Sequence, residues 1–477
     1  MGFVGVIAAA ALSLSAAPQT ASHQDETKND VLRNGVHVDR LYGRVFTDDG
    51  QVLEGYLRWD RNEGSWADML DGAKELPWAH LREAERLDED YARERARERS
   101  ITVGGVRISW DEDPQDEMQT SPSGVRFGHL RSLVVVDDAR ARLRLKSGRE
   151  VDLVREGTDL GRGFRGLVVE IAGWDGPGTG GMAGGGPARG GSAAGESVTG
   201  QSRAGASAGT GPVGDEPVAD EPVELRWRDL DRIELMAPPV GVAPPASHRL
   251  HGTLRTRGGR ELSGFVAWDL DEILTSDVLD GEAAGEDHSI PFERIAAIER
   301  ESRSSARVIL TDGRELVLRN SNDVNEQNRG IEVADPGFGR AVVDWDGFEA
   351  VRFQRAAGSL APYDAYDGGR ELRGTVRSVG GDIVTGTLRW DNDESFTWET
   401  IEGVADGVRF SVEIGAVRSI ERRPERGVEI ELRDGRLLRL AGSEDVDRGN
   451  RGVFVTPEGG ATVFVRWPDL HSVLIDP

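Results

Sequence analysis

The stretch ELSGFVAWDLDE, residues 261–272, decides the fold because the chain contains it in three versions. Similar strings stand at 52–63, VLEGYLRWDRNE, and at 383–394, IVTGTLRWDNDE. In each version apolar residues alternate with other residues up to a Trp-Asp pair, after which acidic residues follow. Alternation with a period of two is typical of a β-strand with one buried face. The repetition predicts three copies of one β unit.

Other repeated features keep the same register. The tryptophans of the three pairs are 209 and 122 residues apart, and the glycines Gly43, Gly252 and Gly374 have the same two separations. Each copy also contains a second pair of apolar runs joined by a turn with Gly, such as LTDGRELVL at 310–318. This pattern is typical of a hairpin. We therefore predict a mainly β fold of three tandem repeats, each made of two packed half-units that are small SH3-like barrels.

The register also sets the domain boundaries. Repeat 1 is expected at 40–236, repeat 2 at 249–354 and repeat 3 at 371–477, with linkers at 237–248 and 355–370 and an N-terminal linker at 23–39. Two insertions enlarge repeat 1. The first, about 81–100, alternates its charges as a solvated surface helix does. The second, about 175–222, is rich in Gly, Ala and Ser and is expected to be a disordered loop.

One known fold resembles the repeated segment. The string RGGRELSGFVAWDLDEIL, at 257–274, resembles the first strands of Sm-like barrels, which share the spacing of two glycines and a following Asp. The resemblance covers about 20 residues in each copy. It implies a small barrel fold. The Asn and the Ile-Arg-Gly motif through which Sm proteins hold RNA are absent from the sequence, so the resemblance implies no RNA binding.

Composition and charge restrict the function. The chain of 477 residues has 84 acidic and 58 basic residues, a formal charge of −26, and this excess disfavours nucleic-acid binding. The absence of cysteine excludes disulfides, thiolate zinc sites and cysteine nucleophiles. Residues 1–22 contain a short apolar run followed by small residues, which predicts a signal peptide. We expect a periplasmic or secreted protein with no transmembrane segment in the mature chain.

The tryptophans pose a choice between core and ligand site. In the segment around Trp268, Val266 lies on the same strand face as the indole, and the other copies repeat this arrangement. We therefore predict that the repeated tryptophans form the barrel cores. Stacking platforms for sugars are the alternative, for which other tryptophans of the chain remain candidates. The predicted core set is Trp59, Trp227, Trp268, Trp345, Trp390 and Trp467, and the platform candidates are Trp66, Trp110, Trp174 and Trp398.

The acidic cluster after each Trp-Asp pair also allows two interpretations. Side-chain oxygens at positions 1, 3 and 4 of the cluster resemble the alternating acids of calcium loops, although no copy supplies a full EF-hand set. The favoured interpretation is a turn that ends the strand and keeps its acids in water. The calcium candidates are Asp269, Asp271, Glu272, Asp391, Asp393 and Glu394, with first-copy counterparts Asp60, Asn62 and Glu63.

A second polar pair recurs in the loop before the last strands of each copy. An Asp is followed six residues later by an Arg, and the Asp is expected to accept a bidentate hydrogen bond from that Arg across the loop. The alternative is a ligand-binding surface, because these loops occur three times. The first copy has Asp159 and Arg165, and the candidate binding residues are Asp323, Arg329, Asp445 and Arg451.

Enzyme signatures give no catalytic residue. The string GASAG at 205–209 has the form of a nucleophile elbow but lies in the glycine-rich insertion, without a strand before it. The eight histidines have no spacing that recurs in the three copies. We expect a non-catalytic binding or scaffold module of the cell envelope, with a protein or an envelope polysaccharide as partner and no cofactor. Calcium is the one cofactor candidate. The alternatives are a polysaccharide-binding or calcium-dependent adhesion protein and an exported hydrolase.

Overall fold

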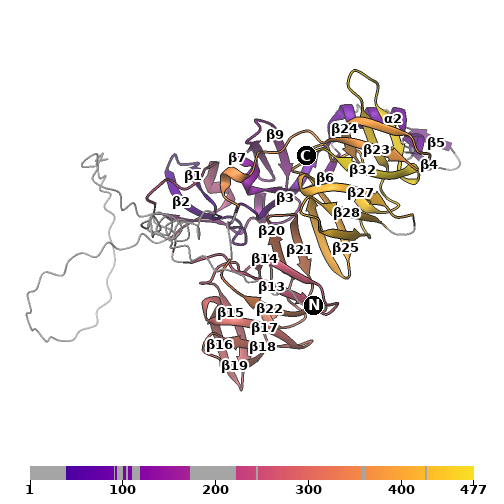
Figure 1. The fold of residues 1–477 in the computed structure, drawn as a ribbon. Coiled ribbons are helices and arrows are strands. Elements are labelled where there is room, and N and C mark those ends of the chain that lie inside the picture. Colours follow the sequence, from indigo (N-terminus) through magenta and orange to yellow (C-terminus); the bar gives the residue numbers. More distant parts are fainter. Residues whose placement is uncertain are drawn as a thin grey trace, which may run out of the picture.

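Repeats 1 and 2 place ten strands in the same sheet order, and repeat 3 keeps eight of these positions in its own sheet (Figure 1). The computed structural model describes residues 39–90, 92–93, 100–103, 106–109, 119–171, 222–242, 245, 247–356, 361–424 and 427–477. Within them the chain is mainly β, as predicted, with three antiparallel sheets, one small hairpin and one α-helix. The expected signal peptide, nearly all of the glycine-rich insertion, Trp110 and Trp174 lie outside these residues.

Repeat 1 forms a ten-stranded sheet in the order β6-β3-β9-β8-β7-β12-β1-β2-β10-β11. Its strands are β1 (Tyr42–Thr47), β2 (Val52–Arg58), β3 (Met69–Glu75), β6 (Thr120–Arg126), β7 (Leu130–Val135), β8 (Arg140–Leu145), β9 (Glu150–Val154), β10 (Leu167–Ile171), β11 (Val223–Leu225) and β12 (Leu230–Leu235).

Repeat 2 has the same order, β16-β15-β19-β18-β17-β22-β13-β14-β20-β21. Its strands are β13 (His251–Thr256), β14 (Glu261–Ala267), β15 (Val278–Ala283), β16 (Glu286–Pro291), β17 (Ile295–Ser302), β18 (Ser305–Leu310), β19 (Glu315–Arg319), β20 (Ile331–Asp335), β21 (Gly339–Val343) and β22 (Phe348–Phe353).

Repeat 3 keeps eight strands in its own sheet, in the order β29-β28-β27-β32-β23-β24-β30-β31, while its hairpin β25–β26 extends the sheet of repeat 2. A bridge between Val404 and Ala441 still joins β25 to the end of β29. The strands are β23 (Arg373–Ser378), β24 (Ile383–Trp390), β25 (Thr400–Ala405), β26 (Val408–Glu413), β27 (Val417–Arg422), β28 (Val428–Leu432), β29 (Leu437–Leu440), β30 (Gly452–Thr456), β31 (Val463–Arg466) and β32 (Leu470–Ile475).

The two halves of each repeat are nested along the chain. In repeat 2, β15 to β19 form one five-stranded half and are inserted between β14 and β20 of the other half. The last strand, β22, joins the halves because it pairs with β13 on one side and β17 on the other. Alternation in the sequence shows where strands lie, but strand partners depend on tertiary contacts. The nesting therefore appears only in the structure.

Short 3-10 helices recur between the strands and also mark the repeat. They are η1 (Phe127–His129), η2 (Gly161–Gly163), η3 (Trp227–Asp229), η4 (Phe292–Arg294), η5 (Asn322–Val324), η6 (Tyr363–Ala365), η7 (Ile414–Ala416), η8 (Glu444–Val446) and η9 (Trp467–Asp469).

The repeated glycine of the first strand is explained by a close backbone approach. A Cβ on Gly252 would lie 2.6 Å from the carbonyl oxygen of Arg352 on β22, and a Cβ on Gly374 would lie 2.2 Å from that of Leu474 on β32. Because no side chain fits at these distances, glycine is required where the first and last strands of a repeat meet. The recurrence of this glycine in each repeat thus follows from its close contact with the strand that joins the two halves.

The helix of repeat 1 starts earlier than predicted and is not a fully solvated one. Helix α2 (Trp78–Leu87) buries Leu81 and Ala84 against Phe454 of β30, and the Glu83 carboxylate pairs with Arg389 at 3.1 Å. The helix is the charged surface helix that was predicted, and its alternating charges conceal a short apolar stripe. The end of the predicted range, Ser100, belongs instead to a hairpin of β4 (Ser100–Val103) and β5 (Val106–Ser109).

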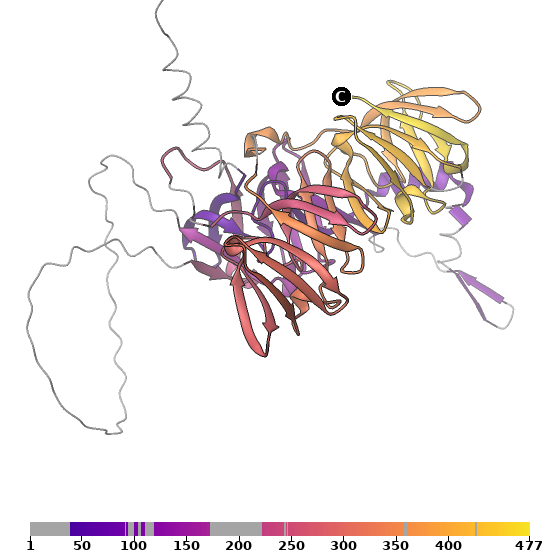
Figure 2. The same cartoon turned by 60° about the horizontal axis from the view of Figure 1, so that its bottom comes forward.

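The three repeats contact one another directly. Strand β21 of repeat 2 pairs with β26 of repeat 3 over five residues, and the buried residues of repeats 2 and 3 form one continuous core. Repeat 1 is joined to repeat 2 by a buried ion pair between Arg249 and Asp68, 2.9 Å apart. Figure 2, turned by 60° from the first view, shows the sheets packed along one body. Among the helices of the described ranges, none is long and apolar enough to cross a membrane.

The expected linker 355–370 is part of this packing. In its described residues, 355–356 and 361–370, the Tyr363 hydroxyl donates to the carbonyl oxygens of Leu130 and Leu235 at 2.8 and 3.1 Å. The Tyr363 ring also packs on Trp66 with 4.6 Å between centroids. The segment therefore fastens repeat 3 to repeat 1 as well as connecting two repeats.

Candidate functional site

The repeated tryptophans lie in the cores, as predicted. Trp268 is fully buried, and the other five members of the set are at most 7% exposed. The indole nitrogen of Trp268 donates to the carbonyl oxygen of Asp323 at 2.9 Å, and Trp59 and Trp390 make the same bond to Asp159 and Asp445. Trp66 and Trp398 are also buried, so these two platform candidates are wrong.

The Asp that follows each tryptophan fixes the same loop from the other side. Asp269 accepts hydrogen bonds from the backbone and side chain of Arg329 and is fully buried. Asp60 binds Arg165 in the same way, and Asp391 accepts from the Arg451 backbone at 2.6 Å. In repeats 1 and 2 the predicted bond from the Arg to the Asp six residues earlier was therefore wrong, because Arg165 and Arg329 bind Asp60 and Asp269 instead.

The earlier Asp of that motif caps a neighbouring strand instead. Asp323 accepts the backbone N–H of Asp280 on β15 at 2.7 Å, and Asp445 accepts that of Glu402 on β25 at 2.6 Å. Sequence spacing favoured the local Arg, but the nested topology brings a strand end closer to the carboxylate. The two recurring motifs are thus connected. The Trp-Asp pair binds the loop that carries the second motif, and the Asp of that loop binds a strand of the sheet.

The turn after each tryptophan is confirmed, but its acids are not kept in water. Asp269 and Leu270 have positive φ angles of 51° and 55°, as a tight hairpin turn of the I′ class requires. Asp60 and Asp391 have the same conformation, at 43° and 47°. The first Asp of the turn is buried in repeats 1 and 2, and its counterpart Asp391 in repeat 3 is half-buried.

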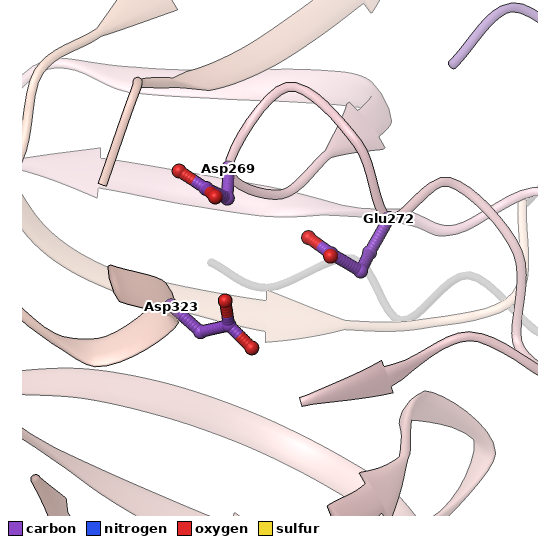
Figure 3. A group of neighbouring side chains, drawn as sticks. All are labelled: Asp269, Glu272 and Asp323. Atoms are coloured by element: carbon purple, nitrogen blue, oxygen red, sulfur yellow. The ribbon is translucent and has the colours of Figure 1, made fainter. Parts of the chain in front are cut away.

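In repeat 2 the structure brings three carboxylates together (Figure 3). One oxygen each from Asp269, Glu272 and Asp323 lie within 4.8 Å of one another. The group joins two of the predicted calcium candidates with one predicted loop candidate. Asp271 is outside it and instead accepts from Arg165 at 2.5 Å and from Arg329 at 3.0 Å.

Two carboxylates of this group have raised pKa values. In Figure 3 the Glu272 and Asp323 carboxylates point toward each other, while that of Asp269 points away from them. The Asp269 carboxylate accepts hydrogen bonds from Arg329 and Asn322. Burial raises the pKa of Glu272 to about 9 and that of Asp323 to about 6, with the neighbouring acids adding to both shifts. These raised pKa values favour the protonated form of Glu272 when no cation is bound.

The equivalent glutamates of repeats 1 and 3 are buried more deeply. Glu63 and Glu394 are 6% and 4% exposed, and burial holds the pKa of both carboxyls well above the ordinary range. The candidate Asp393 lies beside Glu394, and its Oδ2 accepts a hydrogen bond of 2.5 Å from the Ser121 hydroxyl of repeat 1. The Lys74 ammonium lies 3.8 Å from the Glu394 carboxylate. Asp393 and Glu394, two calcium candidates of repeat 3, therefore form part of the interface between repeats 1 and 3.

A cavity of about 640 Å³ lies where the three repeats meet, and we call it the seam pocket. Repeat 1 contributes the turn and loop around Glu63 and Asp159, repeat 2 contributes Arg329 and Glu332, and repeat 3 contributes Arg409. Its volume is within the usual range of small-molecule sites. A smaller cavity of about 360 Å³ lies between repeats 1 and 3 beside Lys74.

Charges of both signs face one another in the seam pocket. The Arg340 guanidinium makes a two-bond pair with the Asp71 carboxylate, at 2.6 and 2.8 Å, across the contact between repeats 1 and 2. Burial raises the pKa of Glu332 to about 7, partly offset by Arg340. Burial and the neighbouring Asp71 also hold the pKa of Asp159 well above its ordinary range. The interior of the pocket therefore disfavours the ionised form of these two carboxyl groups.

Sequence reasoning found some of these residues and missed others. Asp159, Arg165 and Arg329 belong to the repeated motif and line the pocket together with residues of the repeated turn. Arg340 and Arg409 stand at positions that do not recur in the other repeats, so the self-similarity of the sequence gives no signal for them. Comparisons with protein-family models, with curated proteins and with solved structures find no match for this chain.

Proposed function

We propose that this chain is an exported, non-catalytic binding protein of the cell envelope, with the seam pocket as its ligand site. The observation that carries the proposal is that one cavity draws its lining from all three repeats. Repeats that served only as spacers would not need ion pairs between repeats, such as that of Arg340 with Asp71 at the wall of the seam pocket. Repeat proteins commonly use the surface between units for binding.

Two arguments support binding rather than catalysis. Two acids of the pocket are engaged: Asp159 holds a strand end and Asp71 is paired with Arg340. The residues that recur three times serve the fold of each repeat, because Trp268 and Asp269 fasten the loop that carries Arg329. When the residues shared by all repeats serve only the fold, each added repeat adds surface area and no new reaction site. Function then depends on the residues that differ between the repeats.

Export is tested with a reporter fused to the start of the chain. Residues 1–40 joined to an alkaline phosphatase that is active only outside the cytoplasm should give phosphatase activity, and a fusion that starts at residue 23 should give none. Equal activity of the two fusions would remove the export part of the proposal. The non-catalytic part is tested by incubating the purified full chain with chromogenic glycoside, ester and peptide substrates. Turnover that disappears in a Glu63→Gln variant would replace the proposal with an exported hydrolase.

A second candidate is a calcium-dependent or polysaccharide-binding adhesion protein, favoured by the grouping of Asp269, Glu272 and Asp323. Titration calorimetry of the full chain with calcium at pH 8, followed by envelope glycans, tests it. Binding heat that is lost in an Asp323→Asn variant would favour the adhesion protein. Absence of heat with calcium and with glycans would remove this candidate.

A further inference from the structure

Strand β31 (Val463–Arg466) is the outermost strand at one end of the repeat 3 sheet, and no described strand pairs with its outer side. We call this unpaired side the β31 edge. The equivalent strand of repeat 2, β21, is paired on both sides, with β20 of its own repeat and with β26 of repeat 3. The β31 edge therefore lacks the covering strand that β21 has.

The side chains of β31 resemble those of a covered strand. Val463 is the counterpart of Ala341, 122 residues earlier, but Ala341 is fully buried and Val463 is 41% exposed. Val465 is the counterpart of Val343, which is also fully buried, whereas Val465 is only partly buried against the core. Removing apolar surface from water is favourable in proportion to its area. A strand that covers the β31 edge would therefore be stabilised as β26 is on β21.

Strand β31 also lacks the features that keep an edge strand unpaired. Natural sheets protect free edges with charges, proline or very short strands. Strand β16, the free edge of repeat 2, carries Glu286, Asp287 and Pro291, and β11, the free edge of repeat 1, has three residues with Glu224 in the middle. Strand β31 has the sequence VFVR, with its single charge at the end of the strand. Of these three edges, β31 is the one suited to pairing.

The other strands of this chain at the place of β26 do not fit the β31 edge of a second copy. In repeat 2 that place is taken by β16, whose charges and proline disfavour pairing. In repeat 1 it is taken by β6, most of which is buried, and the Arg126 guanidinium of β6 pairs with Glu413 of repeat 3 at 2.9 Å. The occupant of the β31 edge is therefore a strand of another protein.

Strand β26 shows which side chains suit an edge of this kind. In its pair with β21, Phe410 stands opposite Ala341 and is 2% exposed. Val408 stands opposite Val343 and is 1% exposed. Residues of the more polar face, such as Arg409, alternate with these two. In strand addition the main-chain hydrogen bonds supply affinity and the alternate side chains supply specificity.

We propose that the β31 edge is a docking site for another protein, which adds an extended strand antiparallel to β31. The segment that docks has apolar side chains at alternate positions, one opposite Val463 and one opposite Val465, with polar residues between them. The site goes beyond the proposed function and does not rest on it, because no residue of β31 lines the seam pocket.

The mode of binding is tested with a fluorescein-labelled peptide that has the sequence of residues 407–414, GVRFSVEI, and with fluorescence anisotropy of its complex with the full chain. Saturable binding is expected. The Glu413 N–H donates to the carbonyl oxygen of Phe338 at 2.7 Å, so the Ser411 N–H of β26 faces β21 as well, and the Phe410 N–H faces away. N-methylation of the peptide at Ser411 should therefore weaken binding at least about tenfold, and N-methylation at Phe410 should leave it unchanged. No saturable binding, or equal binding of the two methylated peptides, would overturn the proposal.

The location is tested with two variants of similar exposure. Val463→Lys places a charge on β31 and should weaken binding of the peptide at least about fivefold. Val317→Lys is the matched control, because Val317 of β19 is 36% exposed and lies on another repeat, and it should leave binding unchanged. Thermal unfolding of both variants verifies that the fold is retained. Equal binding by the two variants would show that the peptide binds elsewhere and would overturn the assignment to β31.

Sedimentation velocity of the chain without peptide distinguishes another protein from a second copy. The wild type is expected to sediment as a monomer. Self-association that disappears in Val463→Lys would show that a second copy covers the β31 edge, and this result would overturn the assignment to another protein. Either failure leaves the seam pocket and the export signal unaffected, so it is distinct from a failure of the proposed function.

Discussion

Two hairpins at the same place in neighbouring repeats have different surroundings. In repeat 3, β25–β26 pairs with β21 of repeat 2 and buries Val408 and Phe410. In repeat 2, β15–β16 ends its sheet, and no described strand pairs with the outer side of β16. The corresponding residues of β16 are Glu286 and His288. The backbone of the repeat is therefore constant, and the side chains at its edge decide whether another strand joins it.

The composition of β16 is suited to an edge that stays unpaired. Glu286 and Asp287 put charges on the strand, and Pro291 removes a donor from its end. Natural sheets use charges and proline in this way to prevent edge-to-edge association. The comparison teaches that a junction between repeats is encoded by the residues that depart from the repeat, and the predictions below test this difference.

The largest expected effect is in the paired hairpin. Phe410 is 2% exposed and packs near Phe338 of repeat 2, with ring centroids 5.9 Å apart. Replacing it with alanine should lower the free energy of unfolding by about 3–5 kcal/mol, the usual cost of removing a buried phenyl group. His288→Ala, at the same position of the unpaired hairpin, should change it by less than about 0.5 kcal/mol. Urea denaturation measures both, and similar costs would contradict the comparison.

A second prediction concerns the ion pair that joins repeats 1 and 3. Lys74 lies 2.7 Å from Glu399, and both side chains are buried. Lys74→Met should destabilise the chain by about 3 kcal/mol, because the Glu399 carboxylate is left buried without its counter-charge. The exposed pair of Arg314 and Asp312 provides the control, and Arg314→Met should cost less than about 0.5 kcal/mol. A small loss at Lys74, measured by denaturation at pH 7, would show that the repeats do not depend on this pair.

The residues that repeat could be predicted from sequence, and those that differ could not. The period of two placed Trp268 in the core, and the spacing of Gly252 indicated the unit, because both follow from local strand geometry. The pairing of Arg329 with Asp269 was missed because nested strands bring together residues that are 60 positions apart. Arg409 was missed because a pocket between repeats depends on how whole sheets pack, which no local pattern encodes.

A third prediction uses the raised pKa of Glu272. Because the folded pKa of about 9 is above the ordinary 4.5, protonation contributes stability that is fully present below pH 4.5 and is lost as the pH rises toward 9. Glu272→Gln cannot ionise, so it should be more stable than the wild type at pH 8, by a margin that grows as the pH rises from 4.5 toward 9, and nearly equal to it at pH 4.5. Thermal unfolding at the two pH values measures this difference. A variant that is less stable at pH 8 would show that the ionised carboxylate is needed there, as a cation site would require.

The smallest expected change in stability comes from giving the unpaired hairpin the side chains of the paired one. The double substitution Glu286→Val and His288→Phe places the apolar residues of β26 on β16 and should change the free energy of unfolding by less than about 0.5 kcal/mol, since β16 stays at the surface. Its consequence should be association, because an apolar edge strand accepts strands from other molecules. Sedimentation velocity should then show concentration-dependent self-association that the wild type lacks. A variant that sediments like the wild type would mean that the strand order, and not the edge side chains, keeps β16 unpaired.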